Sequence, residues 1–142
     1  IRTSPGSVRD AHFMLQREMA ERLAAHPGTK AWGRLSVMMQ AFCHLEHLFD
    51  VAPESFSPAP KVWSSVVRLI PREVPAVQGE TLLKSLDQVL RCAFSGRRKR
   101  LSNSLKSLDI DWQKVAVDPA MRADDVTLEQ FIALAEDSLS RG

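Results

Sequence analysis

A proline-rich segment with one aromatic residue, FSPAPK at residues 56–61, is the part of the sequence best suited to chemistry. Pro58 and Pro60 fix their own φ angles and lack an N–H donor, so this segment is predicted to be a stiff loop outside any sheet. A stiff loop that presents Phe56 could stack the phenyl ring on a flat partner such as a nucleobase. The alternative is the commoner one, in which the Phe56 side chain fills a core.

A run of basic residues forms the second candidate site. Residues 97–100 are RRKR, and no acidic residue occurs between Asp87 and Asp109. Adjacent cations repel one another unless they face water or a polyanion, and nucleic-acid phosphates are such a polyanion. We predict a short helix at residues 97–108 that presents these cations. The alternative is a solvated helix start without a partner, which is the usual role of a basic run.

Three side chains of types that bind zinc, Cys43, His44 and His47, lie close together in the sequence. A structural zinc site needs four ligands at loop spacings, and the only other cysteine, Cys92, is distant. The surrounding pattern instead places Cys43 in a helix and His47 in a strand, so no metal site is predicted. Two cysteines are also too few for a disulfide framework, which is typical of a reducing cytoplasm.

Length and composition allow one ordinary domain or two small ones in 142 residues. The formal net charge of +2 is too small to name a partner. No apolar run approaches the ~20 residues of a membrane span, and the first residues have no signal-peptide core, so no membrane partner is predicted. The chain begins with Ile1 instead of Met and is expected to be a fragment.

The elements that would hold the proline-rich loop are predicted strands and helices. Residues 11–15 are an apolar run typical of a buried parallel strand, and residues 45–51 and 62–70 are also predicted strands. The last of these is apolar on both faces, as expected inside a sheet that is covered on two sides. Residues 17–25 and 34–43 have helical spacing and are predicted to connect the first two strands.

Composition changes at residues 73–79, which are predicted to be a linker between residues 1–72 and a helical part at residues 80–142. Thr127 and Gln130 have the spacing of a capping box at the start of the last helix. The predicted helices of this part cover residues 82–94, 97–108 and 112–117, with a last helix from residue 127.

Residues 56–69, FSPAPKVWSSVVRL, resemble the F-x-P-x-P-K-V-[DN]-S signature of the KsgA family of ribosomal RNA adenine dimethyltransferases, which is similar to that of their Erm relatives. This chain departs from the signature at Trp63, where the family has Asp or Asn. The resemblance extends over nearly the whole chain. Further segments are similar to family segments in the same order: HFMLQREMAERL (12–23), WGRLSVMMQ (32–40), GRRKRLSNSL (96–105) and DPAMRADDVTLEQF (118–131).

The resemblance implies an α/β fold. Residues 1–72 would be the closing half of a Rossmann-like class I methyltransferase sheet, and residues 80–142 would be a small all-α C-terminal domain that binds RNA. The family transfers methyl groups from S-adenosylmethionine to the N6 amines of two adjacent adenines in small-subunit ribosomal RNA. The implied partners are this RNA and the assembling small ribosomal subunit, in the cytoplasm, with the protein as a monomer.

The resemblance also implies site residues. Phe56 would stack on the target adenine, which is worth roughly 1–3 kcal/mol per base, and Pro58 and Pro60 would hold its loop. Lys61 is either a phosphate contact or a solvated charge, and Arg34 is either a phosphate contact or a salt-bridge partner. The other implied RNA contacts are Arg97, Arg98, Lys99, Arg100, Asn103 and Lys106.

The cofactor-binding part of the family pattern is missing from this sequence. The six glycines never occur two apart, so there is no G-x-G turn, and the NLPY-type motif is absent. The chain alone is therefore expected not to bind S-adenosylmethionine. Two alternatives remain open: a non-catalytic RNA-binding or ribosome-assembly module, and a helical DNA-binding protein with residues 82–108 as a helix-turn-helix.

Overall fold

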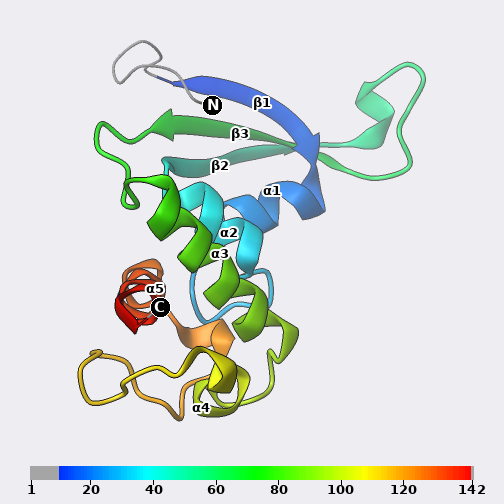
Figure 1. Ribbon diagram of the computed structural model, residues 1–142. Coiled ribbons are helices and arrows are strands. Elements are labelled where there is room, and N and C mark those ends of the chain that lie inside the picture. The colour runs from blue at the N-terminus through cyan, green and yellow to red at the C-terminus, as the bar shows by residue number, and fades with distance from the viewer. Residues whose placement is uncertain (1–9, 142) are drawn as a thin grey trace.

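The computed structural model describes residues 10–141, so the start of the predicted first domain, residues 1–9, lies outside the described residues together with Gly142. Figure 1 shows a sheet at one end of the molecule and helices on one side of it. In chain order the elements are β1 (Ala11–Gln16), α1 (Arg17–Leu23), α2 (Arg34–Gln40), β2 (Cys43–Val51), β3 (Ser64–Pro71), α3 (Glu80–Ser95), α4 (Leu101–Ser104) and α5 (Leu128–Arg141), with short 3-10 turns at Pro53–Ser55, Lys106–Leu108 and Ala123–Asp125. Within residues 10–141, every helix falls short of the length and hydropathy needed to cross a bilayer.

The sheet has three strands in the order β1-β3-β2, and β3 is antiparallel to both neighbours. The prediction of a parallel strand at residues 11–15 is therefore wrong for the pairing, which runs antiparallel from Ala11↔Leu69 to Gln16↔Ser64. β1 and β2 do run in the same direction, but β3 lies between them. The order of the strands along the chain does not show that β3 lies in the middle of the sheet. The chain turns back through a long loop before it forms β3.

Only one face of β3 is covered by the described helices. Val67 and Leu69 are buried on that face, whereas Val66 on the opposite face is only partly buried. The registers place Val66 between Met14 of β1 and Phe49 of β2, which are 52% and 55% exposed. The expectation of a sheet covered on both faces is wrong for the described residues, and an apolar row lies open across the sheet.

One hydrophobic core joins the sheet part to the helical part. It contains Trp32 and Val37 from before the predicted linker together with Leu86 and Phe131 from after it. Trp32 also makes a polar contact across this boundary, since its Nε1 donates a hydrogen bond of 2.9 Å to the Val126 carbonyl oxygen. The two parts of the chain are thus held together by buried contacts, as expected of elements that share one core.

The predicted linker at residues 73–79 has neither helix nor strand, but it is packed. Val77 is 2% exposed and belongs to the core, and the Ala76 N–H donates to the Ala41 carbonyl oxygen at 2.8 Å. The proposed boundary between two domains stays a prediction, and the segment that would form it is fixed against α2 and α3.

Helices α3 and α5 form the centre of the helical part and pack on each other. Their aromatic rings meet at Phe94 and Phe131, with centroids 5.6 Å apart. The predicted capping box at the start of α5 is confirmed: the Thr127 N–H donates to Gln130 Oε1 at 3.0 Å, and the Gln130 N–H donates to Thr127 Oγ1 at 3.1 Å. Such reciprocal bonds satisfy N–H groups that the helix itself leaves free.

Three local predictions differ from the structure. Residues 112–117 form turns instead of a helix, because the Asp111 carboxylate accepts a hydrogen bond from the Gln113 N–H at 3.1 Å and closes a local turn. Residues 97–100 are a turn that ends in an isolated bridge to Arg122, so the helix begins only at Leu101. Cys43, which was predicted in a helix, is the first residue of β2.

Candidate nucleic-acid interface

The loop that carries Phe56 lies between β2 and β3 and projects from one end of the sheet (Figure 1). It begins with a 3-10 turn, in which the Phe56 N–H donates to the Pro53 carbonyl oxygen at 3.2 Å. The Phe56 side chain is partly buried and does not belong to the hydrophobic core, while Pro58, Pro60 and Lys61 are exposed. The loop therefore holds an aromatic ring away from the core at the edge of the molecule.

Contacts with α1 and β2 fix the far end of this loop. The Arg17 N–H donates to the Trp63 carbonyl oxygen at 2.9 Å, and the Arg17 guanidinium lies 5.6 Å from the centre of the Trp63 ring. On the next strand, Asp50 accepts hydrogen bonds from Ser65 Oγ at 2.6 Å and from His47 Nε2 at 2.7 Å. These two hydrogen bonds lower the pKa of Asp50 below its usual range.

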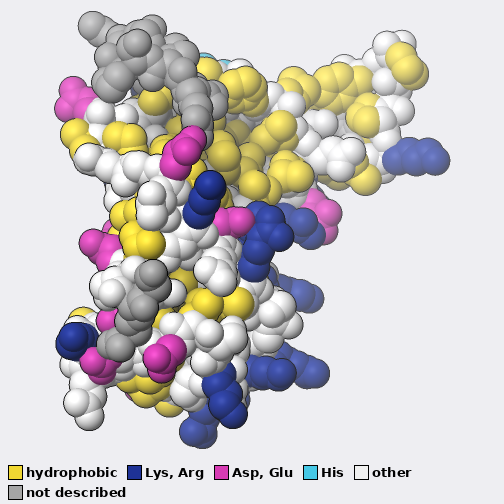
Figure 2. Space-filling model, in the orientation of Figure 1, with side chains coloured by type: hydrophobic (Ala, Val, Ile, Leu, Met, Phe, Trp, Pro, Cys, Tyr) yellow, Lys and Arg dark blue, Asp and Glu magenta, His cyan; other side chains and the backbone are white. Residues whose placement is uncertain are grey.

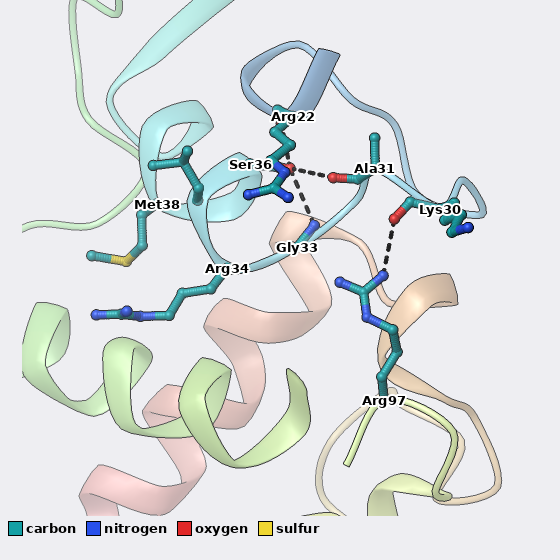
Figure 3. Close-up of a pocket in the computed structure, with 9 residues that line it drawn as sticks. Arg22, Lys30, Ala31, Gly33, Arg34, Ser36, Met38 and Arg97 are labelled. Atoms are coloured by element: carbon teal, nitrogen blue, oxygen red, sulfur yellow. Dashed lines mark hydrogen bonds between the residues drawn. The ribbon is translucent and has the colours of Figure 1, made fainter. Parts of the chain in front are cut away.

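Arg97, the first cation of the basic run, is used inside the molecule. Its Nη2 donates to the Trp32 carbonyl oxygen at 2.8 Å, and its Nη1 donates to the Lys30 carbonyl oxygen at 3.1 Å (Figure 3). Nη1 also lies 2.9 Å from Asp124 Oδ1, in an ion pair without hydrogen-bond alignment, and the guanidinium lies 5.1 Å from the centre of the Phe94 ring. Arg97 thus ties three segments together.

The next cations face outward. Arg98, Lys99 and Arg100 are exposed in the turn between α3 and α4, and Asn103 and Lys106 are exposed just after it. None of these cations makes an ion pair within the described part of the chain. Unpaired cations at one turn are available to an external anion, and phosphate is the anion that repeats along a nucleic acid.

A hollow of about 760 Å³ lies beside this turn and is bordered by the basic side chains of Arg22, Lys30, Arg34 and Arg97 (Figure 3). Figure 2 shows Lys and Arg side chains gathered along the same side of the molecule, from below the sheet to the end of the helical part. Sequence reasoning missed Arg22 and Lys30, because neither belongs to a basic run and no local pattern singles it out. Folding brings them to the basic run.

Arg34, the weaker sequence candidate, is held by an ion pair. Its Nε and Nη2 each lie 2.7 Å from Asp87 Oδ1 on α3, and Arg91 Nε binds the other oxygen of Asp87 at 2.9 Å. Burial of Asp87 would raise its pKa, but the hydrogen bonds and charges of Arg34 and Arg91 outweigh burial and lower it below the usual range. Arg34 therefore serves as a link between α2 and α3.

Acidification should weaken the fold through Asp87. Because its pKa is lower in the folded chain than in the unfolded chain, its stabilising contribution is complete above the unfolded pKa and is lost as pH falls through the folded pKa. We expect the free energy of unfolding in urea to fall as pH drops below the unfolded pKa of about 4, and to fall less steeply in Asp87→Asn. Asp125→Asn, at an exposed position, is the matched control. Equal slopes in Asp87→Asn and the parent chain would contradict this assignment.

The basic hollow does not fit S-adenosylmethionine. Its four cationic side chains would repel the sulfonium of that molecule, and none of the described residues that line it is acidic and able to grip a ribose. No group of three or more His, Cys, Asp or Glu side chains lies close enough to hold a metal ion among the residues that the structure describes. The hollow and the turn beside it are instead suited to anionic oxygens.

Comparisons with known proteins show which proteins this chain is similar to. A family model described as ribosomal RNA adenine dimethylase matches residues 3–138. Ribosomal RNA small subunit methyltransferase A of Dechloromonas aromatica is 48% identical over 130 residues, which cover 90% of this chain and 51% of the relative. The protein of the same name from Pseudomonas putida is 47% identical over 134 residues, which cover 92% of this chain and 49% of the relative. The chain thus spans about half the length of the curated relatives it matches.

Solved structures of ribosomal RNA methyltransferases share the fold. A dimethyladenosine transferase from Plasmodium falciparum superimposes with a TM-score of 0.72 at 25% sequence identity, over 89% of this chain and 55% of that chain. The 23S rRNA methyltransferase ErmE superimposes with a TM-score of 0.68 at 25% identity, over 93% of this chain and 55% of that chain. The mixed α/β arrangement of this chain is therefore also found in class I-like methyltransferases.

Proposed function

Since this chain belongs to the ribosomal RNA adenine dimethylase family, we propose that it forms the base-capturing and RNA-binding part of an enzyme that dimethylates two adjacent adenines in small-subunit ribosomal RNA. The methyl groups go to the N6 amines and come from S-adenosylmethionine. The observation that carries this proposal is the loop at residues 52–63, which holds the Phe56 ring outside the core and ends in the exposed Lys61 and Trp63. Stacking on one face of a base and contact with its phosphates are what capture of an unpaired adenine requires.

Within this proposal the site residues have different roles. Phe56 stacks on the target base, Pro58 and Pro60 keep the loop stiff, and Lys61 contacts a phosphate. Arg97 and Arg34 act as positioning residues, because both guanidinium groups are engaged by this chain's own oxygens. The remaining contacts with the RNA backbone are made by Arg98, Lys99, Arg100, Asn103 and Lys106.

We assign the S-adenosylmethionine site to the part of the relatives that this chain does not match. The poor fit of the basic hollow and the length of the relatives, of which this chain covers 51% and 49%, both support this assignment. The isolated chain should then give no heat of S-adenosylmethionine binding in calorimetry. Action during ribosome assembly and a cytoplasmic location stay predictions that rest on the family resemblance and on the low cysteine content.

The structure supports the two alternatives, an RNA-binding module and a helix-turn-helix protein, to different degrees. A non-catalytic RNA-binding module would use the same cationic turn, and methyl transfer by the full-length protein separates it from the enzyme. The helix-turn-helix alternative is disfavoured, because the helix after the turn, α4, spans only the four residues Leu101–Ser104. A recognition helix must be long enough to lie in a major groove and reach several bases.

The Phe56→Ala variant tests the proposed function directly. In the full-length protein, we expect methyl transfer to small-subunit RNA to fall roughly tenfold to a hundredfold, because the ring that holds the base is lost. The unfolding midpoint should fall only slightly, since Phe56 is partly buried but lies outside the core. Phe56→Tyr should retain most of the activity.

A matched control is Leu139→Ala, which removes a 38% exposed apolar side chain from α5, away from the sheet. This variant should leave methyl transfer intact. Full activity of a folded Phe56→Ala variant would exclude Phe56 as the base-stacking residue.

A further inference from the structure

Trp63 is an exposed aromatic side chain that has no role in the proposed function. It stands immediately before β3 at the foot of the Phe56 loop, and it is 42% exposed. The other two Trp residues differ: Trp32 is 1% exposed, and Trp112 packs against the core. Trp is enriched at binding interfaces, because its ring is apolar and its N–H is polar.

The position of the Trp63 ring is fixed by its neighbours. The Arg17 guanidinium lies 5.6 Å from the ring centre, and Arg17 is itself held 3.6 Å from Glu21 on the next turn of α1. The Arg17 N–H also donates to the Trp63 carbonyl oxygen at 2.9 Å. A ring held in this way loses little conformational entropy when a flat ligand stacks on it.

The Trp63 side chain borders a hollow large enough for one nucleotide. This hollow has a volume of about 450 Å³ and is lined by Trp63, Val62, Lys61 and the start of α1. Two acidic residues also line it, but Glu21 lies beside Arg17 and Glu18 lies 3.6 Å from Arg22. Lys61 makes no ion pair within the described residues and is therefore the cation left to a ligand.

We propose that Trp63 is a second stacking platform, which holds an unpaired base that flanks the target base while Lys61 contacts the phosphate beside it. This inference rests on the proposed function, because it takes Phe56 as the first platform. Phe56 and Trp63 are seven residues apart at the two ends of one loop, so their backbones are separated by no more than about 25 Å. A single strand that passes along the loop can meet both rings.

The presence of Trp at position 63 supports a nucleobase as the ligand of this hollow. An indole presents a flat ring that stacks on any base without regard to sequence. A flat apolar face with one free cation at its edge also matches the shape and charge of a nucleotide, whose base is apolar on its faces and whose phosphate is anionic. Trp63 would then position the RNA strand without touching the reacting amine.

Protection of the Trp63 ring from a neutral quencher tests this proposal in the folded chain itself. In a Trp112→Phe background, the remaining residues are the buried Trp32 and the exposed Trp63, so acrylamide quenching reports mainly on Trp63. We expect an oligoadenylate of about eight nucleotides to bind and to reduce acrylamide quenching of Trp63. RNA that binds with unchanged quenching would overturn the platform and leave the proposed function standing.

Substitutions give a second, independent readout. Trp63→Asn should weaken oligoadenylate binding about tenfold without changing its salt dependence, and Trp63→Phe should recover most of the affinity because a ring is restored. Equal affinity in Trp63→Asn and the parent chain would also overturn the platform. Failure of the parent chain to bind any RNA would overturn both this inference and the proposed RNA interface.

Discussion

Replacing Trp32 with alanine should lower the free energy of unfolding by about 3–5 kcal/mol, which is the typical cost of removing a fully buried Trp side chain. Trp32 is 1% exposed and belongs to the core that joins both parts of the chain. Its Nε1 bonds to the Val126 carbonyl, and its own carbonyl accepts a hydrogen bond from Arg97. The substitution therefore opens a cavity and leaves a buried carbonyl without its partner.

Urea unfolding followed by circular dichroism measures this loss. Trp32→Phe is the matched variant, because it keeps an aromatic ring in the core and removes the hydrogen bond, at an expected cost of about 1–3 kcal/mol. Trp63→Phe, at an exposed position, should change the unfolding free energy by less than about 0.5 kcal/mol.

The same experiment tests how the two parts of the chain depend on each other. Because Trp32 lies before the segment at residues 73–79 and Val126 lies after it, we expect one cooperative transition in which strands and helices unfold together. A Trp32→Ala variant whose helices melt at the parent midpoint would show instead that residues 80–142 fold independently.

The sequence was informative wherever a local signal determines structure. The capping pair Thr127 and Gln130 predicted the start of α5, and the apolar spacing before Gly96 predicted α3. The prolines predicted a loop without strand pairing, and residues 53–63 form one. These features depend on neighbours within a few residues, so they can be inferred without the fold.

Features that depend on distant neighbours were not predictable in the same way. The apolar run at residues 11–15 is a strand, but its antiparallel partner is fixed only by how the chain returns through β3. The basic run was predicted to begin a short helix that presents its cations, whereas Arg97 turns inward because the Lys30 and Trp32 carbonyl oxygens, 67 and 65 residues away in sequence, accept its hydrogen bonds. A one-dimensional pattern does not show which cation of a run meets such acceptors.

Because Arg97 faces inward and its neighbours Arg98 and Lys99 face outward, we expect substitutions of these two neighbours to have a large effect on RNA binding. Arg98→Glu/Lys99→Glu should weaken binding to small-subunit RNA several tens of times at about 0.1 M salt, because two exposed cations no longer release counterions from the RNA. The slope of log affinity against log salt should become shallower by about 1.4–1.8. Filter binding over a range of salt concentrations measures both quantities.

The matched control is Lys84→Glu/Lys114→Glu, which changes the net charge equally at exposed lysines outside the cationic turn. Binding should fall much less in this control. An equal loss in both double variants would mean that the RNA responds to total charge and not to the turn.

Arg97 should behave in the opposite way to its two neighbours. Its guanidinium bonds to the Trp32 and Lys30 carbonyl oxygens and lies against Phe94, so Arg97→Gln should lower the unfolding free energy by about 1–3 kcal/mol. The salt slope of RNA binding should stay close to the parent value, because a group already engaged within the chain releases few counterions. If Arg97→Gln left stability unchanged and reduced the slope by about one, Arg97 would have to be an RNA contact, and the inward contacts would be secondary.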